Sequence, residues 1–248
     1  MISAVISSMN RTDRLIQMLP SWAKIEKIKD IVIVDWSSEE PIIENENIKN
    51  ILNKYDKIKI IRVENQKYFH LSKSYNIGVQ FTDPTYKILL KLDADYVSIK
   101  DSWINYLSLI FWTKDNAYIL RSYFITGSWK FYQSSNGFLL VNKKDFKSIN
   151  GYNENLGHIW GYEDVDLHKR LLDFQQKKDQ SFSKIEFFNI KDYIYHIPHD
   201  NNLRTCNYPN KEIDYKLNKE ISTKQTSWTP QKYQLLSQKD KYTRISAI

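Results

Sequence analysis

Apolar and polar residues alternate along the first 95 residues in blocks typical of strands and helices. Short apolar runs predict buried β-strands at 3–7, 31–35, 58–63 and 86–92. Apolar residues at helical spacing between these runs predict helices near 15–22 and 71–81. Pro20 lies inside the first helix and predicts a break or a new helix start there. Strands separated by helices indicate βαβ crossovers and a mainly parallel sheet.

The pattern is less regular in the second half of the chain. It predicts helices over 103–112 and 163–177 and strands over 117–121, 137–141, 184–188 and 192–196. From about Asn207 the chain is polar and lysine-rich without clear periodicity, which predicts a surface-wrapping tail, partly ordered at best. We therefore expect one α/β domain over 1–204, with halves 1–96 and 97–204, and an extension over 205–248.

Composition narrows the class of protein. A length of 248 residues suits one α/β domain, and 42% hydrophobic with 26% charged residues is ordinary for a soluble globular protein. No apolar run reaches the length of a membrane span, and Met1–Ser7 lacks the basic start of a signal peptide. The single cysteine, Cys206, excludes an internal disulfide framework. These features favour a cytoplasmic protein.

The formal net charge of +7 raises the question of an anionic partner. The lysines of this chain are scattered along the sequence. A nucleic-acid-binding protein more often has a dense basic stripe or a known nucleic-acid-binding motif. We expect no nucleic-acid partner and interpret the lysines mainly as a solvated surface. Peripheral contact with an anionic membrane, or an anionic acceptor, is the alternative.

The first candidate for chemistry is Asp93-Ala94-Asp95, directly after a predicted buried strand. Carboxylates in a strand-end loop can share a divalent cation such as Mg²⁺ or Mn²⁺ and contact a nucleotide. The triplet alone is weak, because Asp164-Val165-Asp166 is a second example in the same chain. The position after the strand favours the functional interpretation, and Asp35 also ends a predicted strand.

The second candidate is the segment Trp160-Gly161-Tyr162-Glu163-Asp164-Val165-Asp166. Gly161 permits a tight turn, and the acids fall in the first turn of the next helix. Acids there can serve only to stabilise the helix start, with Asp166 and Arg170 forming an i,i+4 pair. A carboxylate at the mouth of the sheet can equally act as a general base for an acceptor hydroxyl. The pattern leaves both interpretations open.

The third candidate is His196-Ile197-Pro198-His199, which follows a late predicted strand. A single histidine is most often structural. Two histidines at a strand end, beside Asp200 and Asn202, could supply an imidazole to a metal held by Asp95.

Four blocks over roughly residues 2–200 resemble a GT-A-fold glycosyltransferase, close to family two and to the galactosyltransferase C-terminal module. The blocks are Ile31-Val32-Ile33-Val34-Asp35-Trp36-Ser37-Ser38; Phe69-His70-Leu71-Ser72-Lys73-Ser74-Tyr75-Asn76-Ile77-Gly78; Asp93-Ala94-Asp95; and the series 136–138, 146–152, 160–167 and 170–171. The resemblance implies a Rossmann-like, mixed but mainly parallel sheet flanked by helices. Residues 1–96 would bind the nucleotide-sugar, and 97–204 would bind the acceptor and carry catalysis.

The resemblance also implies roles for single residues. Asp95 and a late histidine (His196, with His199 as the alternative) would hold Mn²⁺ or Mg²⁺, and Asp93 would touch the ribose or the metal. Asp164 would be the catalytic base. The expected acceptor-binding residues are Trp160, Gly161, Tyr162 and Glu163. The expected donor-binding residues are Asn10, Arg11, Asp35, Lys73, Asn76 and Asp93.

Two departures from the family pattern concern the binding pockets. Tyr162 stands where the family often has a glycine or tryptophan, which affects the acceptor pocket. Trp36 replaces the second acid of the common Asp-Asp-x-Ser form, which affects the contact with the base.

The implied function is inverting, metal-dependent transfer of a hexose or N-acetylhexosamine from a nucleotide-sugar, with UDP as the default. The acceptor would be a glycan, a lipid-linked precursor or a protein. One alternative is a catalytically inactive nucleotide- or sugar-binding module. Another is a nucleotidyltransferase, which usually has a glycine-rich phosphate loop near its N-terminus, whereas Ser7-Ser8-Met9-Asn10-Arg11 contains no glycine.

Overall fold

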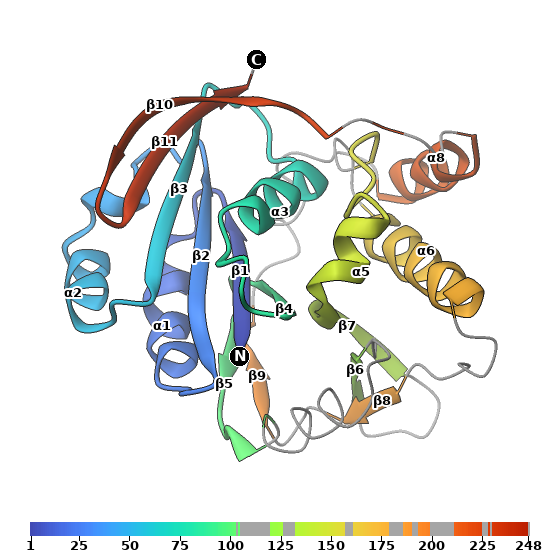
Figure 1. The fold of residues 1–248 in the computed structure, drawn as a ribbon, viewed down its shortest axis with the longest axis horizontal. Helices are drawn as coiled ribbons and strands as arrows, with labels where there is room; N and C mark the ends of the chain where they lie inside the picture. Colours follow the sequence, from blue (N-terminus) through green and yellow to red (C-terminus); the bar gives the residue numbers. More distant parts are fainter. Residues whose placement is uncertain are drawn as a thin grey trace.

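The computed structural model describes most of the chain (Figure 1). The described residues are 1–102, 104, 120–125, 132–156, 161–178, 186–189, 193–198, 211–224, 228 and 230–247.

A nine-stranded sheet forms the centre of the described fold, in the order β10-β11-β3-β2-β1-β4-β7-β6-β8. Its strands are β1 (Ile2–Ser8), β2 (Ile28–Trp36), β3 (Ile58–Glu64), β4 (Ile88–Asp93), β6 (Leu120–Ile125), β7 (Tyr132–Asn142), β8 (Glu186–Asn189), β10 (Tyr233–Lys239) and β11 (Tyr242–Ala247). The pairs β1–β2, β1–β4, β2–β3, β3–β11 and β6–β8 are parallel. Strand β7 runs antiparallel to both β4 and β6. The mixed, mainly parallel sheet expected from the sequence is confirmed.

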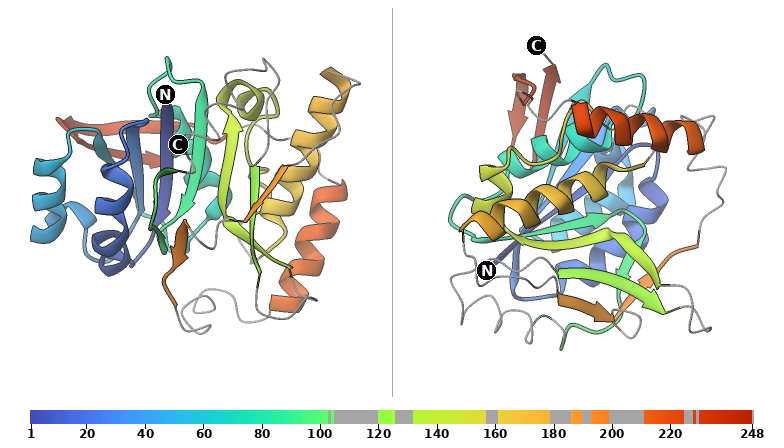
Figure 2. Two further views of the ribbon diagram at one scale, coloured as in Figure 1. Left: turned by 90° about the horizontal axis from the view of Figure 1, so that it is seen from below. Right: turned by 90° about the vertical axis from the view of Figure 1, so that its right-hand side faces the viewer.

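Helices cover both faces of this sheet (Figures 1 and 2). They are α1 (Thr12–Ala23), the 3₁₀ turn η1 (Ile42–Glu44), α2 (Glu46–Lys54), α3 (Leu71–Gln80), α5 (Lys143–Ser148), α6 (Glu163–Lys178) and α8 (Lys211–Lys224). Side chains on a strand point alternately to its two faces, so Ala4 and Ile6 pack with α1 and α2. Val5 packs with α3, α5 and α6 on the other face. This double cover explains why the central strands are continuous apolar runs.

A second, two-stranded sheet lies beside the main one. Its strands, β5 (Tyr96–Ser98) and β9 (Ile194–His196), pair antiparallel with Tyr96 opposite His196. This pairing brings the residues just after β4 next to a histidine that is about 100 residues further along the chain.

The predicted break at Pro20 is wrong, because α1 runs unbroken from Thr12 to Ala23. Proline removes only one backbone donor, and the helix continues with the N–H of Lys24 donating to the Pro20 carbonyl at 3.3 Å. Leu19 and Trp22 on either side are fully buried against the sheet, and this packing outweighs the lost bond. Apart from Ile104, the helix predicted over 103–112 lies outside the described residues, and so do residues 117–119 of the strand predicted over 117–121.

The expectation of a tail that is partly ordered at best after about residue 207 is wrong for the part of this segment that the structure describes. It contains α8 and the hairpin β10–β11, which adds two strands to the sheet beyond β3 (Figure 1). Thr243 and Ile245 of β11 are buried, and Arg244 on the opposite side pairs with Glu64 at 2.6 Å. Helix α8 was missed because the residues it buries, Asp214 and Asn218, are polar and give no apolar period.

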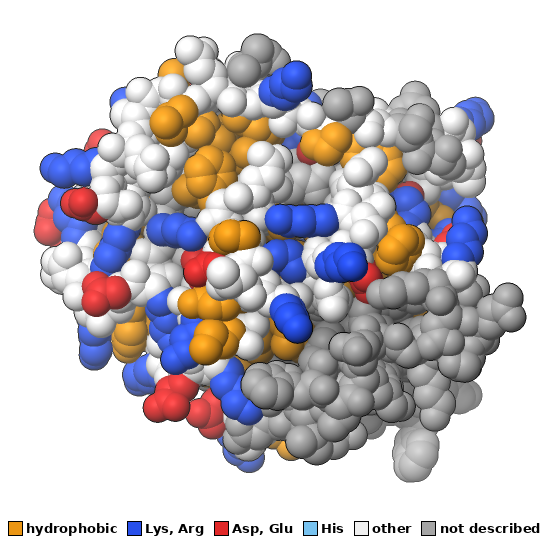
Figure 3. All heavy atoms as spheres, in the orientation of Figure 1, with side chains coloured by type: hydrophobic (Ala, Val, Ile, Leu, Met, Phe, Trp, Pro, Cys, Tyr) orange, Lys and Arg blue, Asp and Glu red, His pale blue; other side chains and the backbone are white. Residues whose placement is uncertain are grey.

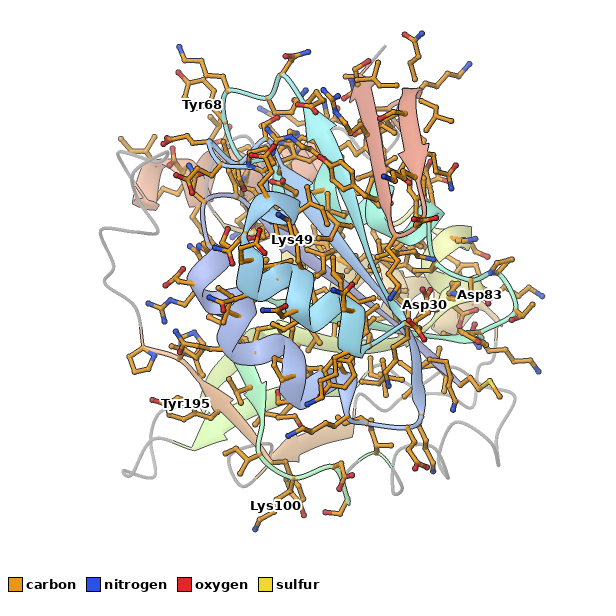
Figure 4. The ribbon with its side chains drawn as sticks, turned by 90° about the vertical axis from the view of Figure 1, so that its left-hand side faces the viewer. Asp30, Lys49, Tyr68, Asp83, Lys100 and Tyr195 are labelled. Atoms are coloured by element: carbon orange, nitrogen blue, oxygen red, sulfur yellow. The ribbon has the colours of Figure 1, made fainter. Side chains whose placement is uncertain are left out.

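The surface agrees with the dispersed charge of the sequence. Lysine and arginine side chains are spread over the face in Figure 3 and do not gather into one stripe. Figure 4 looks onto α1 and α2, with Lys49 on the outer side of α2. Asp30 and Asp83 lie together near the amino ends of the strands, where the Asp83 N–H donates to Asp30 Oδ2 at 2.7 Å. No helix among the described residues is long and apolar enough to cross a membrane.

Candidate active site

The candidate site lies at the carboxyl ends of the central parallel strands, where ligands of open α/β sheets bind. Strand β4 ends at Asp93, and Asp95 follows in the turn before β5. Helix α6 begins at Glu163, so its first turn brings Asp164 to the same end of the sheet. These acids, far apart in the sequence, are thereby gathered in one place.

Asp95 and His196 face each other across the small sheet. Asp95 is buried, and its Oδ2 lies 3.5 Å from His196 Nε2. The same oxygen lies 3.5 Å from Arg11 Nη1, and the Ile197 N–H donates to the Asp95 carbonyl at 2.8 Å. The structure therefore brings together the two residues expected to ligate a metal, with an arginine beside them.

A carboxylate oxygen and an imidazole nitrogen suit Mn²⁺ in kind. Among the residues that the structure describes, no group of three or more His, Cys, Asp and Glu side chains is arranged to hold a metal ion. Asp95 and His196 thus fit as a two-residue anchor whose other ligands would be donor phosphates and water. His199, the alternative ligand, lies outside the described residues, as do Asp200 and Asn202.

Lys91 joins the predicted donor carboxylate to the predicted base. Its side chain is almost completely buried, and its Nζ lies 3.0 Å from Asp93 Oδ1 and 3.5 Å from Asp164 Oδ1. A buried ammonium placed between two carboxylates fixes their positions and offsets part of their charge. This bridge links the two halves of the site directly.

Two tyrosines complete the same network. Tyr75 of α3 donates its hydroxyl to Asp93 Oδ1 at 2.8 Å, and Tyr152 donates to Asp164 Oδ1 at 2.7 Å. Their rings stack with centroids 5.6 Å apart, and Lys91 Nζ lies 5.0 Å from the centre of the Tyr75 ring. Gly137 leaves the space for this arrangement, because a Cβ there would be 2.7 Å from Asp93 Oδ2.

The surroundings move the pKa values of the two carboxyls in opposite directions. Burial raises the pKa of Asp164, and the Lys91 ammonium and Tyr152 hydroxyl offset this only in part. Burial also acts on Asp93, but Lys91 and Tyr75 outweigh it and the pKa of Asp93 is lowered. Asp93 is thus held as an anion, while Asp164 has the greater affinity for a proton.

Glu163 stands next to the predicted base Asp164 and is buried, at 7% exposed. Burial, with a smaller contribution from the Asp164 charge, raises the pKa of Glu163 to about 7. Its ionisation therefore falls near neutral pH, where ordinary glutamates are fully charged.

The predicted acceptor segment is a tight turn that leads into α6. Gly161 and Tyr162 both have positive φ values, of 96° and 76°. Both residues are half-buried, and the Gly161 carbonyl accepts a hydrogen bond from Asn218 of α8 at 2.6 Å. Trp160 lies outside the described residues.

Two of the predicted donor residues have structural partners on every side. The Asp35 side chain is fully buried and accepts hydrogen bonds from the Ser38 and Ile42 N–H groups and from Arg62 at 2.7 Å. Asn76 bonds both backbone groups of Tyr152, its Oδ1 accepting from the N–H at 2.8 Å and its Nδ2 donating to the carbonyl at 2.9 Å. Contact with a nucleotide would require each to leave these partners, so their donor roles stay predictions that this geometry does not favour.

The remaining donor residues lie nearer the surface. Asn10 follows β1 with φ of 57°, and its Oδ1 accepts from the Glu39 N–H at 2.8 Å. Lys73 is half-buried in the first turn of α3. Arg11, one-third exposed beside Asp95, is the best placed of these to meet an anionic donor.

Sequence reasoning did not assign roles to Lys91, Tyr75 and Tyr152. The role of Lys91 could have been predicted from the sequence. It is a charged residue within the mostly apolar strand Ile88–Asp93, and a buried charge requires a partner. The tyrosines carried no such signal, since buried tyrosine is common in cores.

Comparison with known proteins places this geometry in a fold family. Residues 122–200 match a family model described as the N-terminal domain of galactosyltransferase, and no curated protein sequence matches the chain. The catalytic domain of Drosophila β1,4-galactosyltransferase 7 superposes with a TM-score of 0.59 at 16% identity, covering 99% of this chain and 92% of that one. Residues 1–349 of S. aureus TarS give a TM-score of 0.57 at 14% identity, covering 79% of this chain and 60% of that one. The fold is that of the GT-A glycosyltransferases.

The GT-A fold also has relatives of another kind. The 4-diphosphocytidyl-2C-methyl-D-erythritol synthase of Anaerococcus prevotii gives a TM-score of 0.53 at 16% identity, covering 83% of this chain and 94% of that one. Within the GT-A framework, the galactosyltransferase match spans Gly161–Asp166 and His196 but neither Asp93 nor Asp95. The family-model match therefore includes the predicted acceptor segment and the predicted metal ligand His196, whereas Asp93 and Asp95 lie outside it.

Proposed function

We propose that this chain is a metal-dependent, inverting glycosyltransferase. It would transfer a hexose or N-acetylhexosamine from a UDP-sugar to an acceptor hydroxyl. The observation that carries the proposal is the Lys91 bridge, which ties Asp93 at the donor end of β4 to Asp164 at the start of α6. One site thus combines a carboxylate held as an anion with a buried carboxylate of raised pKa that can accept a proton.

Two structural neighbours support the choice of donor. The Drosophila galactosyltransferase was solved with manganese, UDP-galactose and xylobiose, and TarS was solved with UDP-GlcNAc. In this chain Asp95 and His196 would hold the metal, which when bound would neutralise charge on the diphosphate leaving group. Arg11, beside the same Asp95 oxygen, would contact the diphosphate as a second positive group.

The residues of the chain suggest a single displacement. Asp164 would take the proton of the acceptor hydroxyl as that oxygen attacks the anomeric carbon. The bond from this carbon to the diphosphate oxygen breaks on the opposite face, so the anomeric configuration inverts. Tyr152 and Lys91 would hold the Asp164 carboxylate in place, which contributes through positioning and not through a covalent intermediate.

Nucleotide and metal binding provide the first test. Thermal unfolding of the full chain with UDP, GDP, CDP or dTDP, each with Mn²⁺, Mg²⁺ or EDTA, reports binding to the folded state. We expect the midpoint to rise with UDP only when the metal is present, and Asp95→Asn to remove the rise. Lack of a shift with every nucleotide would contradict the proposal.

The assignment of the base needs a separate measurement. Asp164→Asn should keep the UDP- and metal-dependent shift but reduce transfer by about a thousandfold, because a positioned general base contributes 10² to 10⁴ in rate. Product anomers identified by NMR would test inversion. Near-normal transfer by Asp164→Asn would reject Asp164 as the base.

Nucleotidyl transfer is the alternative activity for this fold, because one of the structural neighbours, the Anaerococcus synthase, is named for a diphosphocytidyl product. A nucleotidyltransferase would release pyrophosphate from a nucleoside triphosphate, whereas a glycosyltransferase would release UDP from UDP-sugar. Assaying both products from the same preparation separates the two. The loop after β1, Met9-Asn10-Arg11, lacks the glycines of a phosphate cradle and favours glycosyl transfer.

A further inference from the structure

Helix α8, from the C-terminal part of the chain, packs directly on the turn that precedes the proposed base. Asn218 Nδ2 donates to the Gly161 carbonyl at 2.6 Å, and Ser222 Oγ donates to Asp166 Oδ1 at 2.6 Å. The two contacts lie one turn apart on α8, so they fix the helix along the start of α6. Figures 1 and 2 show α8 lying beside α6.

Tyr215 of α8 and Tyr162 of the turn meet at this contact. Their ring centroids are 5.3 Å apart and their planes are at 79°, so the two rings form a nearly square corner. Gly161 permits the approach, because a Cβ at that position would lie 3.0 Å from Tyr215 Cδ2. A larger residue at 161 would push the helix and the turn apart.

Tyr162 occupies a backbone conformation that is unusual for a bulky side chain. Its φ of 76° lies in the left-handed region, where such residues are rare and cost about 1 kcal/mol or more. The strain persists because α6 on one side and α8 on the other hold the turn. Its effect is to direct the Tyr162 ring onto Tyr215 immediately before Glu163 and Asp164.

The contact between Tyr162 and Tyr215 is partly exposed to solvent, unlike a contact in the hydrophobic core. Tyr215 is 38% exposed and Tyr162 is half-buried, so parts of both rings stay accessible. Phenol rings offer apolar faces together with hydroxyl groups at their tips. A pyranose ring has the complementary surface, with C–H groups on its faces and hydroxyls around its edge.

We propose that Tyr162 and Tyr215 form a subsite for a saccharide unit of the acceptor, which makes α8 part of the acceptor site. The inference rests on the proposed function for its place in the reaction, and it selects a glycan among the possible acceptors. Tyr215 would act as a binding residue, since its contacts are with the Tyr162 ring and the Gly161 position. Because Tyr162 precedes Asp164 by two residues at the start of α6, a sugar bound at this corner would lie near the proposed base.

Saccharide binding and donor turnover can be measured separately on the full chain. Binding is followed by saturation-transfer NMR and calorimetry with xylobiose and the methyl glycosides of xylose, glucose, galactose and N-acetylglucosamine, in the presence of UDP and Mn²⁺. Turnover is followed as UDP release from UDP-sugars without acceptor. The variants are Tyr215→Leu, which keeps apolar packing on Gly161, and Tyr215→Phe, which keeps the ring. Leu217→Ala, exposed on the other side of α8, is the matched control.

We expect at least one probe to bind the wild type, and Tyr215→Leu to weaken that binding about tenfold. Tyr215→Phe should bind nearly as the wild type does. Leu217→Ala should match the wild type in both saccharide binding and UDP release. Equal binding by the wild type and Tyr215→Leu, or no binding of any probe to the wild type, would overturn the subsite. Saccharide binding that depends on Tyr215, without UDP release from any donor, would support the subsite and reject the glycosyltransferase proposal.

Discussion

Lys91 is an ammonium inside strand β4, whose other residues except Asp93 are apolar, and its burial shapes the chemistry of the site. Two acids, Asp93 and Asp164, approach it, and their opposed charges raise its pKa despite the desolvation. The pKa of Lys91 therefore lies above the ordinary lysine value, and the residue is charged at neutral pH. Without it, Asp164 would be a buried carboxylate with no cation bonded to it in this network.

Replacing Lys91 tests how strongly the network depends on this charge. Lys91→Met keeps the volume but leaves the acids unneutralised, and we expect a loss of about 3 kcal/mol in the free energy of unfolding. Urea denaturation measures the loss. Asp164→Asn should cost less in the Lys91→Met background than in the wild type, because the two residues interact. Strictly additive effects would show that the pair is not coupled.

Glu163 predicts a pH dependence of stability with a definite sign. Its pKa is raised from 4.5 to about 7 in the folded protein, so the folded state binds the proton more tightly than the unfolded chain does. The stabilisation is complete below pH 4.5, falls between 4.5 and 7, and is absent above 7. It amounts to roughly 3 kcal/mol from the size of the shift.

The comparison with Glu163→Gln isolates this effect. Glutamine keeps the shape of protonated glutamate but does not titrate. The wild type should therefore lose more stability than Glu163→Gln between pH 5 and pH 8, measured by urea denaturation of both proteins at each pH. Parallel pH profiles for the two proteins would contradict the raised pKa.

At the scale of elements, the central strands and the helices α1, α3 and α6 could be predicted because their apolar residues repeat with a clear period, whereas the short helices α2 and α5 were not predicted. The same reasoning failed for β11, whose sequence Tyr-Thr-Arg-Ile-Ser-Ala reads as weakly apolar. Thr243 and Ile245 are buried because β11 pairs with the edge of β3. That partner strand is far away in the sequence, so the residues near β11 carry no signal of the pairing. Asp35 shows the same limit, since its partner Arg62 belongs to the neighbouring strand.

The contribution of β11 can be measured with one substitution. Ile245 is 2% exposed and packs in the core on the α3 face of the sheet, so Ile245→Ala should cost about 3 kcal/mol. Leu235→Ala in β10, where the side chain is 56% exposed, should change stability by less than about 0.5 kcal/mol. Urea denaturation of both variants provides the comparison. Similar values for the two would mean that the hairpin is only loosely attached.

At the scale of the whole molecule, the C-terminal segment connects the two ends of the fold. Arg170 of α6 lies over the Trp228 ring at 4.6 Å, and the Gln231 N–H donates to Glu154 Oε2 at 2.8 Å. The chain then continues into β10 and β11 beside β3. Sequence analysis set this segment apart as an extension, because its lysines and lack of periodicity hide contacts that are all long-range.

These contacts predict that the two halves unfold together. Far-UV circular dichroism and tryptophan fluorescence should give coincident urea transitions, since α6 and the β3 edge share the same connecting segment. Separate midpoints for the two probes would show that the halves are independent units. Adding UDP with Mn²⁺ should shift both probes equally.

The position of β11 also bears on how the chain folds as it is made. Strand β3 accepts β11 as its parallel neighbour, and Tyr242 pairs with Ile60 from about 180 residues further along the chain. Contacts of such high sequence separation are slow to form, because a long loop must close first. While the ribosome is still adding residues 65–241, one edge of β3 has no strand beside it and can pair with another nascent chain. Strand β11 therefore covers the edge of β3 only at the end of synthesis. Until then, chaperones should bind mainly at this uncovered edge of β3.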